Sequence, residues 1–191
     1  MQKKYTLPFL FIILLSTAWM LPQPDDTLIY HDNNVKLHWK DYKATPDPDF
    51  GAIAVSYVGF RMSYKGTARQ DSLIVIVEAF FDPKISWTKP DTTAYTLTHE
   101  QVHFDITELY SRKLKQSIQN ATLTYKNYQS VMRELERAAH KDMNTADSIY
   151  EAATDYSRNA VEQKKWNENI AVDLKNMSTY AKDTFVVAVH L

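Results

Sequence analysis

The hydrophobic pattern of this chain changes its period near residue 90, and this change limits the folds that the chain can adopt. Residues 52–64 alternate apolar and polar side chains, as a half-buried strand does. Residues 71–82 hold a nearly continuous apolar run from Leu73 to Val77, which predicts a strand buried on both faces. Beyond residue 91 the apolar positions recur every three or four residues. The sequence therefore predicts an α+β fold, with an N-terminal antiparallel sheet followed by a helical half.

Shorter elements can be placed from local signals. Residues 27–31 and 35–39 flank a turn and predict a hairpin, and Gly59 predicts a bulge or bend in its strand. The last residues, 184–191, are expected to return to the sheet as a final strand. Three helices are expected, from a cap at Asp91 or Thr92 to about residue 116, over about 121–141, and over about 145–174.

Composition narrows the chemistry that the protein can perform. A chain of 191 residues suits one domain, and its net charge of -1, with acids and bases interspersed, argues against nucleic acid or an anionic membrane as a partner. The absence of cysteine excludes disulfides, thiolate zinc ligands and cysteine nucleophiles. Any metal must be held by histidine and carboxylate.

The N-terminal segment has the layout of a secretory signal peptide. Lys3 and Lys4 precede an apolar run, and Ser16 and Ala18 form a small-residue cleavage site. A retained membrane anchor is the alternative, but Pro22 and the polar residues before it interrupt the span of about 20 apolar residues that an anchor needs. We expect residues 1–18 to be removed, leaving a single domain over 19–191 that is periplasmic or extracellular.

The most informative motif is H-E-x-x-H at His99, Glu100 and His103. Residues four apart on a helix lie about 40° apart around its axis, so the two histidines can share one metal ion. Glu100 is turned by about 100° from His99, within reach of a metal-bound water without being a ligand itself. This is the arrangement of zinc-assisted hydrolysis, with the glutamate as general base. The alternative is a helix with two solvent-facing histidines.

The third metal ligand is not identified by the motif. Asp105 and Glu108 are turned away from the histidine face, and we expect them to lie on a solvated face or to pair with Arg112 and Lys113. A ligand from the downstream helices is therefore needed. The candidates there are Glu136, His140, Glu151, Asp155 and Tyr156.

Longer strings around the motif resemble a known family. Ser86 and Trp87, followed by "HEQVHFDITELYSRKL", are similar to the DUF922 family of predicted bacterial secreted zinc-dependent proteases. The likeness extends upstream to "YVGFRMSY" and "VEAFFDPKISW", and downstream to "SIYEAATDYSRNAVEQKKWNENI", and so covers most of the chain after the signal segment. The resemblance implies a secreted zinc metallopeptidase that acts on peptides or proteins.

The chain departs from the family pattern in the downstream helix. Ala153 and Tyr156 stand where that pattern has a glutamate and a histidine, both plausible metal ligands. The phenol of Tyr156 could bind the metal weakly or stabilise an oxyanion, but a tyrosine in an apolar stripe is more often part of the core. Trp87 is expected to pack at the start of the motif helix rather than to contact substrate.

Three functions are compatible with these features. The leading hypothesis is a zinc peptidase in which His99 and His103 hold the metal, Glu100 is the base and the strand around Val75 presents an edge to substrate. The second is a catalytically silent relative that uses the same fold for binding in the envelope. The third is a structural protein without metal, which the intact motif disfavours.

Overall fold

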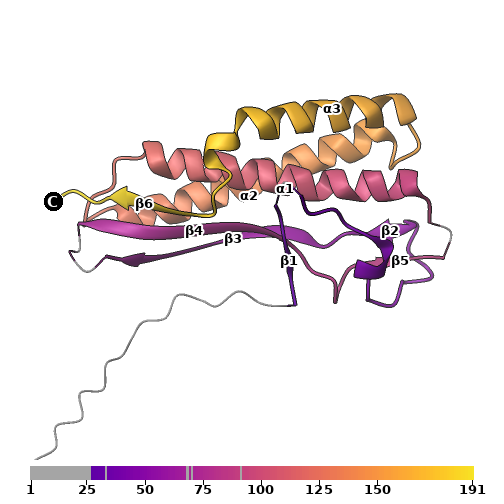
Figure 1. Cartoon of the computed structure of the whole chain (residues 1–191), viewed down its shortest axis with the longest axis horizontal. Helices are drawn as coiled ribbons and strands as arrows, with labels where there is room; N and C mark the ends of the chain where they lie inside the picture. Colours follow the sequence, from indigo (N-terminus) through magenta and orange to yellow (C-terminus); the bar gives the residue numbers. More distant parts are fainter. Residues whose placement is uncertain (1–26, 33, 68, 70, 91) are drawn as a thin grey trace, which may run out of the picture.

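The computed structural model describes residues 27–32, 34–67, 69, 71–90 and 92–191, and the expected signal segment lies outside them. An antiparallel sheet is covered on one face by three helices (Figure 1), which confirms the predicted α+β fold. The elements in chain order are β1 (Ile29–Tyr30), the 3-10 helix η1 (Trp39–Asp41), β2 (Ala54–Val55), β3 (Val58–Gly66), β4 (Ser72–Phe81), β5 (Trp87–Thr88), α1 (Ala94–Asn120), α2 (Tyr128–Thr154), α3 (Ala160–Asn176), the 3-10 helix η2 (Ser178–Tyr180) and β6 (Thr184–Ala188).

Strand β4 is the centre of the main sheet. It pairs with β3 along its length on one side, and with β1 and β6 on the other. The predicted final strand is thereby confirmed. Val75 lies opposite both Tyr64 and Phe185, so the prediction that this strand offers a free edge to substrate is wrong.

Burial along β4 alternates rather than covering both faces. Leu73, Val75 and Val77 are buried under the helices, whereas Ile74 and Ile76 between them are only half-buried. The prediction of a strand buried on both faces is therefore wrong. Helices cover a single face of this sheet, and the continuous apolar run disguised the period of two.

Two local predictions in the first half also fail. Residues 27–31 do not form a hairpin with 35–39, because β1 pairs with the end of β4 and residues 39–41 form η1. Gly59 lies in regular register opposite Phe80 without a bulge. A Cβ atom at this position would come within 3.1 Å of the Phe80 ring, so a larger residue would require this ring to shift slightly.

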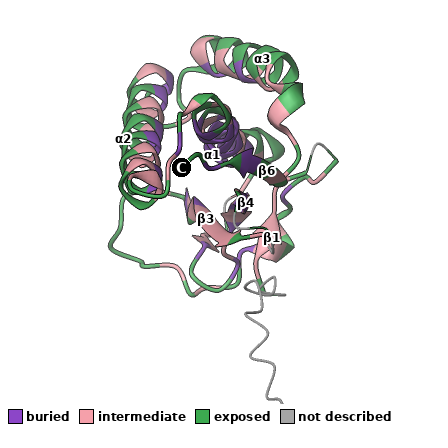
Figure 2. Cartoon of the chain, turned by 90° about the vertical axis from the view of Figure 1, so that its left-hand side faces the viewer, coloured by how far each residue is buried: buried purple, intermediate pink, exposed green. Residues whose placement is uncertain are grey.

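Helix α1 is the central element of the molecule. It packs against β3 and β4 on one side and against α2 and α3 on the other (Figure 2). The side chain of Thr93 caps its N-terminus by accepting a hydrogen bond from the backbone N–H of Thr96. Because α1 is enclosed from several directions, polar residues on it are buried as well as apolar ones, and the histidine motif is among them.

Helix α2 runs without a break through the region where the sequence predicted one, between residues 141 and 145. No proline or glycine interrupts residues 128–154, and Met143 and Tyr150 continue the buried stripe that begins at Met132 and Ala139. The helix ends instead where Asp155, followed by two more residues, adopts a left-handed conformation. The part of α2 beyond residue 145 is thereby brought alongside the motif.

A small two-stranded sheet flanks the N-terminal part of α1. Its strands β2 and β5 pair antiparallel, with Ala54 opposite Thr88 and Val55 opposite Trp87. The Trp87 ring packs edge-on against Phe50, with centroids 5.9 Å apart, in agreement with the expected packing role.

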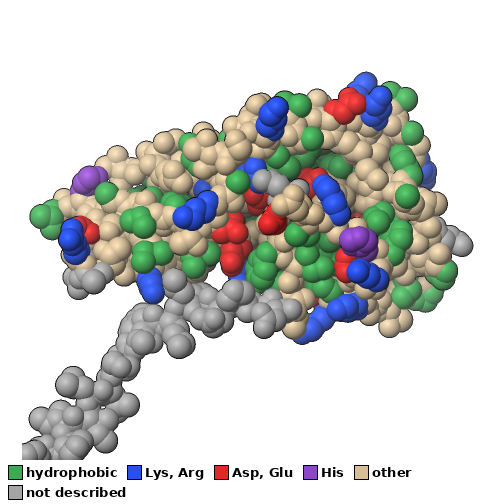
Figure 3. Space-filling model, viewed as in Figure 1, with side chains coloured by type: hydrophobic (Ala, Val, Ile, Leu, Met, Phe, Trp, Pro, Cys, Tyr) green, Lys and Arg blue, Asp and Glu red, His purple; other side chains and the backbone are tan. Residues whose placement is uncertain are grey.

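The surface charge and the character of the helices bear on how the molecule meets its surroundings. On the face shown in Figure 3, basic side chains are scattered among acidic and neutral ones, without a continuous basic surface over the part that the structure describes. No helix among the described residues has the length and apolar character needed to cross a membrane.

Candidate metal centre

The two motif histidines face the same point, as their spacing predicts. His99 and His103 lie on one side of α1, and their Nε2 atoms are 3.2 Å apart. Both residues are buried, with exposures of 4% and 8%. The alternative of solvent-facing histidines is therefore excluded.

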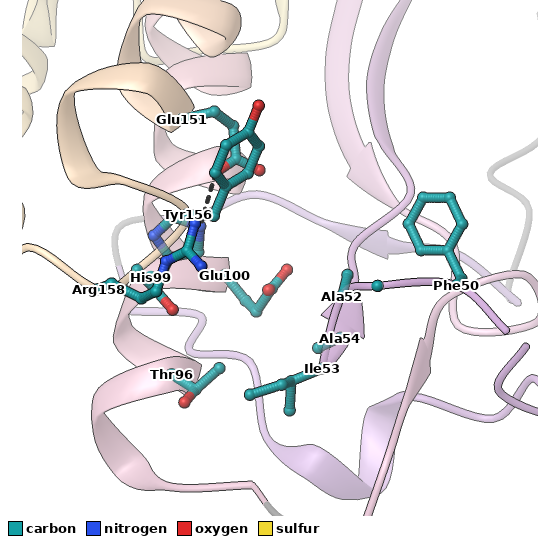
Figure 4. Close-up of a pocket in the computed structure, with 12 residues that line it drawn as sticks. Phe50, Ala52, Ile53, Ala54, Thr96, His99, Glu100, Glu151, Tyr156 and Arg158 are labelled. Atoms are coloured by element: carbon teal, nitrogen blue, oxygen red, sulfur yellow. Dashed lines mark ion pairs between the residues drawn. The ribbon is translucent and has the colours of Figure 1, made fainter. Parts of the chain in front are cut away.

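A carboxylate from α2 completes the cluster. Glu151 Oε2 lies 3.3 Å from His99 Nε2, and Glu151 Oε1 lies 3.5 Å from His103 Nε2. One ligand atom from each of these three residues lies within 4.8 Å of the other two. Figure 4 shows Glu151 meeting His99 from the neighbouring helix. Two imidazoles and one carboxylate form a ligand set used by catalytic zinc, which leaves one coordination position open.

The other ring nitrogens of the histidines are held by hydrogen-bond partners. His99 Nδ1 lies 2.7 Å from Gln163 Oε1 and 2.8 Å from the Tyr150 hydroxyl. His103 Nδ1 lies 2.5 Å from Asp147 Oδ1. A hydrogen bond at Nδ1 fixes the orientation of each ring and directs its Nε2 lone pair to a metal. The outer groups thus support a metal site built from the two Nε2 atoms.

Protons stabilise this cluster when no metal is bound. Burial lowers the pKa of His103, but hydrogen bonds with Asp147 and Glu151 outweigh burial and raise this pKa to about 10. Burial likewise raises the pKa of Glu151, but the interactions with His103 and His99 outweigh burial and lower this pKa to about 2. A metal ion that binds here must displace the proton on His103.

One buried atom is left unsatisfied in this arrangement. Glu151 Oε2 is inaccessible to solvent and has no hydrogen-bond partner among the described residues, although it faces His99. A buried carboxylate oxygen without a hydrogen bond is costly unless an ion coordinates it. The residues present therefore fit a metal ion held by His99, His103 and Glu151.

Glu100 is oriented differently from the three cluster residues. Its Oε2 accepts a hydrogen bond of 2.6 Å from Ser56 Oγ, and Ser56 Oγ is in turn 2.7 Å from the Tyr42 hydroxyl. In Figure 4 the Glu100 side chain points from α1 into the space between this helix and β2. Glu100 therefore lies beside the cluster and is not one of its three members.

A cleft of about 470 Å³ opens onto the cluster. It is bounded by the segment that leads into β2, by the start of α1 and by the residues that follow α2. The lining residues are Phe50, Gly51, Ala52, Ile53, Ala54, Thr96, His99, Glu100, Glu151, Tyr156, Ser157 and Arg158.

Tyr156 lies at the rim of this cleft. Its side chain is 64% exposed, so the expectation that it belongs to the core is wrong. The metal cluster among the described residues contains Glu151 and not Tyr156. Asp155, Tyr156 and Ser157 all have positive φ, between 48° and 68°, which is a costly conformation for three residues with side chains. This strained turn directs Tyr156 to the cleft mouth.

The acidic residues further along α1 are not ligands, as predicted. Glu108 accepts a hydrogen bond of 2.6 Å from Arg112 Nε, and Asp105 pairs with His31 at 3.0 Å. Of the two predicted alternatives, pairing with Arg112 is confirmed for Glu108, whereas a solvated face is wrong because Glu108 is only 2% exposed. The central position of α1 accounts for this difference.

Sequence reasoning named Glu151 as one of five candidates and could not choose among them. Two of the others have different partners: His140 stacks on Phe60, with centroids 4.0 Å apart, and Asp155 pairs with Arg158. Asp147 and Gln163 were missed, although Asp147 and Glu151 share the spacing of four that made the histidine pair recognisable.

Comparison of the chain with protein-family models, curated proteins and solved structures finds no match.

Proposed function

We propose that this protein is an exported zinc-dependent peptidase. The observation that carries the proposal is the convergence of His99, His103 and Glu151, with Glu100 beside them at the cleft. The resemblance to the DUF922 family of predicted secreted zinc-dependent proteases supports the same activity. Export rests on the layout of residues 1–18.

The chemistry follows from the positions of the side chains. Zinc held by His99, His103 and Glu151 would supply a Lewis acid, which lowers the pKa of a bound water towards about 7. Glu100 lies where it can accept a proton from the attacking water and later deliver it to the leaving amine. The partners of the Nδ1 atoms, Asp147 and Gln163, keep both imidazoles oriented during this process.

Strand β2 supplies a surface suited to an extended peptide. The Lys89 N–H donates to the Ile53 carbonyl over 2.8 Å, so Ile53 and Val55 form the hydrogen bonds of the ladder with β5. In such a ladder the N–H and C=O groups of the intervening residue, Ala54, point to the opposite edge of the strand. Ala54 also lines the cleft. A peptide that adds to this edge would run past Glu100.

A catalytically silent binding protein is the second candidate. The observation that favours it is that the three residues contact one another directly, at 3.2–3.5 Å between His99, His103 and Glu151. The departures at Ala153 and Tyr156 from the family pattern favour it as well. Such a protein would hold peptides in the cleft and leave them uncleaved.

The decisive experiment is digestion of a diverse peptide mixture by the zinc-supplied protein, with products identified by mass spectrometry. Glu100→Gln should retain its zinc and cut hydrolysis by about 10²–10⁴-fold. His103→Ala should lose both zinc and activity. The matched control is Glu168→Gln, because the Glu168 side chain is exposed on α3 and 65% accessible. No products from wild type would refute the peptidase and favour the silent binding protein.

A further inference from the structure

A chain of hydrogen bonds links the general base to the protein core. Ser56 immediately follows β2, and its Oγ donates to Glu100 Oε2 over 2.6 Å. The Tyr42 hydroxyl lies 2.7 Å from the same Oγ atom. No residue of α1 takes part in this chain apart from Glu100 itself.

The direction of both hydrogen bonds follows from the chemistry of the groups. A serine hydroxyl has a single proton, and Ser56 gives it to the Glu100 carboxylate. The Tyr42 hydroxyl must therefore donate to Ser56. Burial, with a smaller contribution from the charge of Glu100, raises the pKa of Tyr42 far above its usual value, so this phenol keeps its proton.

Tyr42 is in turn held by packing. It is buried, and its ring lies edge-on to Phe81 at a centroid distance of 5.0 Å and beside Trp39 at 5.1 Å. Phe81 is the fully buried last residue of β4. The orientation of Glu100 is thereby tied to the main sheet through Tyr42 and Ser56.

We propose that Ser56 is a positioning residue for the reaction: its hydroxyl holds one carboxylate oxygen of Glu100, so that the other faces the cleft. This inference rests on the proposed function, since it assigns a role within that activity. Ser56 also follows the strand whose free edge is suited to substrate. One short segment, residues 54–56, thus orients both the peptide and the base.

The test compares Ser56→Ala with wild type, both zinc-loaded, on a peptide substrate found in the digestion experiment. Loss of a hydrogen bond to a charged group should raise the activation free energy enough to lower kcat about tenfold. KM and zinc content should stay unchanged. Ser56→Thr keeps the hydroxyl and should restore most of kcat. Tyr57→Phe is the control in the neighbouring position, because Tyr57 is exposed and is not among the residues that line the cleft.

A double-mutant cycle separates positioning from a general structural effect. If Ser56 acts only through Glu100, adding Ser56→Ala to Glu100→Gln should cause no further loss of the residual kcat. A tenfold loss in both backgrounds, or an unchanged kcat in Ser56→Ala, would overturn the inference while leaving the peptidase intact. A zinc-loaded wild type without activity would instead overturn the proposed function, and this inference with it. Urea unfolding midpoints show that each variant is folded.

Discussion

Zinc binding should strengthen as the pH rises, because His103 holds a proton in the metal-free protein. The protonated ring has two N–H groups: the one at Nδ1 is held by Asp147 Oδ1 at 2.5 Å, and the one at Nε2, which zinc would replace, faces Glu151 Oε1. These hydrogen bonds outweigh the effect of burial and raise the pKa of His103 to about 10. Zinc needs the neutral imidazole, so binding must release this proton.

The size of the effect follows from counting protons. Glu151, with its pKa lowered to about 2, is ionised throughout the neutral range and releases none. One proton released per zinc ion changes the affinity about tenfold per pH unit. Between about pH 6.5 and about pH 8.5, the affinity should therefore rise about 100-fold.

The stability of the metal-free protein should change in the opposite direction. Above the ordinary histidine pKa of about 6.5 the unfolded chain has lost this proton, whereas the folded protein keeps it up to about pH 10. The contribution of His103 is therefore complete below about pH 6.5 and is lost as the pH rises towards about 10. The free energy of unfolding should fall by at most about 1.4 kcal/mol per pH unit over this range.

Two measurements test this competition between proton and zinc. Titration against a zinc chelator at three pH values gives the affinity, and calorimetry in buffers of different ionisation enthalpy gives the number of protons released. Asp147→Asn removes one cause of the raised His103 pKa and should flatten the pH dependence of zinc binding. An affinity that does not change with pH in wild type, with no proton released, would refute the reasoning.

Two further predictions concern carboxylates on α1 and α2. Glu151→Gln should weaken zinc binding at least about 100-fold in the same chelator titration, whereas Glu168→Gln should bind zinc as wild type does; equal affinities would remove Glu151 from the site. Glu108→Ala should lower the free energy of urea unfolding by about 3–5 kcal/mol, because it leaves the buried Arg112 without its 2.6 Å carboxylate partner. Zinc stoichiometry should not change in Glu108→Ala, and a loss of zinc would contradict the assignment of Glu108 as structural.

The relative directions of side chains close together in the chain were predictable, because helix geometry is local. His99 and His103 converge through a spacing of four, and Glu100 diverges from them through a spacing of one. The order of strands before helices was predictable for the same reason, since each period is visible within a short window. The end of α2 was not predictable in this way. The sequence suggested a break near residue 145, but the stripe of buried residues continues and the helix runs to Thr154.

Contacts between distant segments could be decided only by the tertiary structure. Glu151 reaches the histidines because α2 packs along α1, and no spacing in the sequence distinguishes it from Glu136 or Asp155. Ser56 reaches Glu100 from the opposite side, through a strand that the sequence does not link to the motif. The sequence by itself thus determined the convergence of the histidine pair and the separate direction of Glu100. The approach of Glu151 and the orientation of Glu100 depend on how helices and strands pack. Packing joins residues whose separation along the chain carries no information about their separation in space.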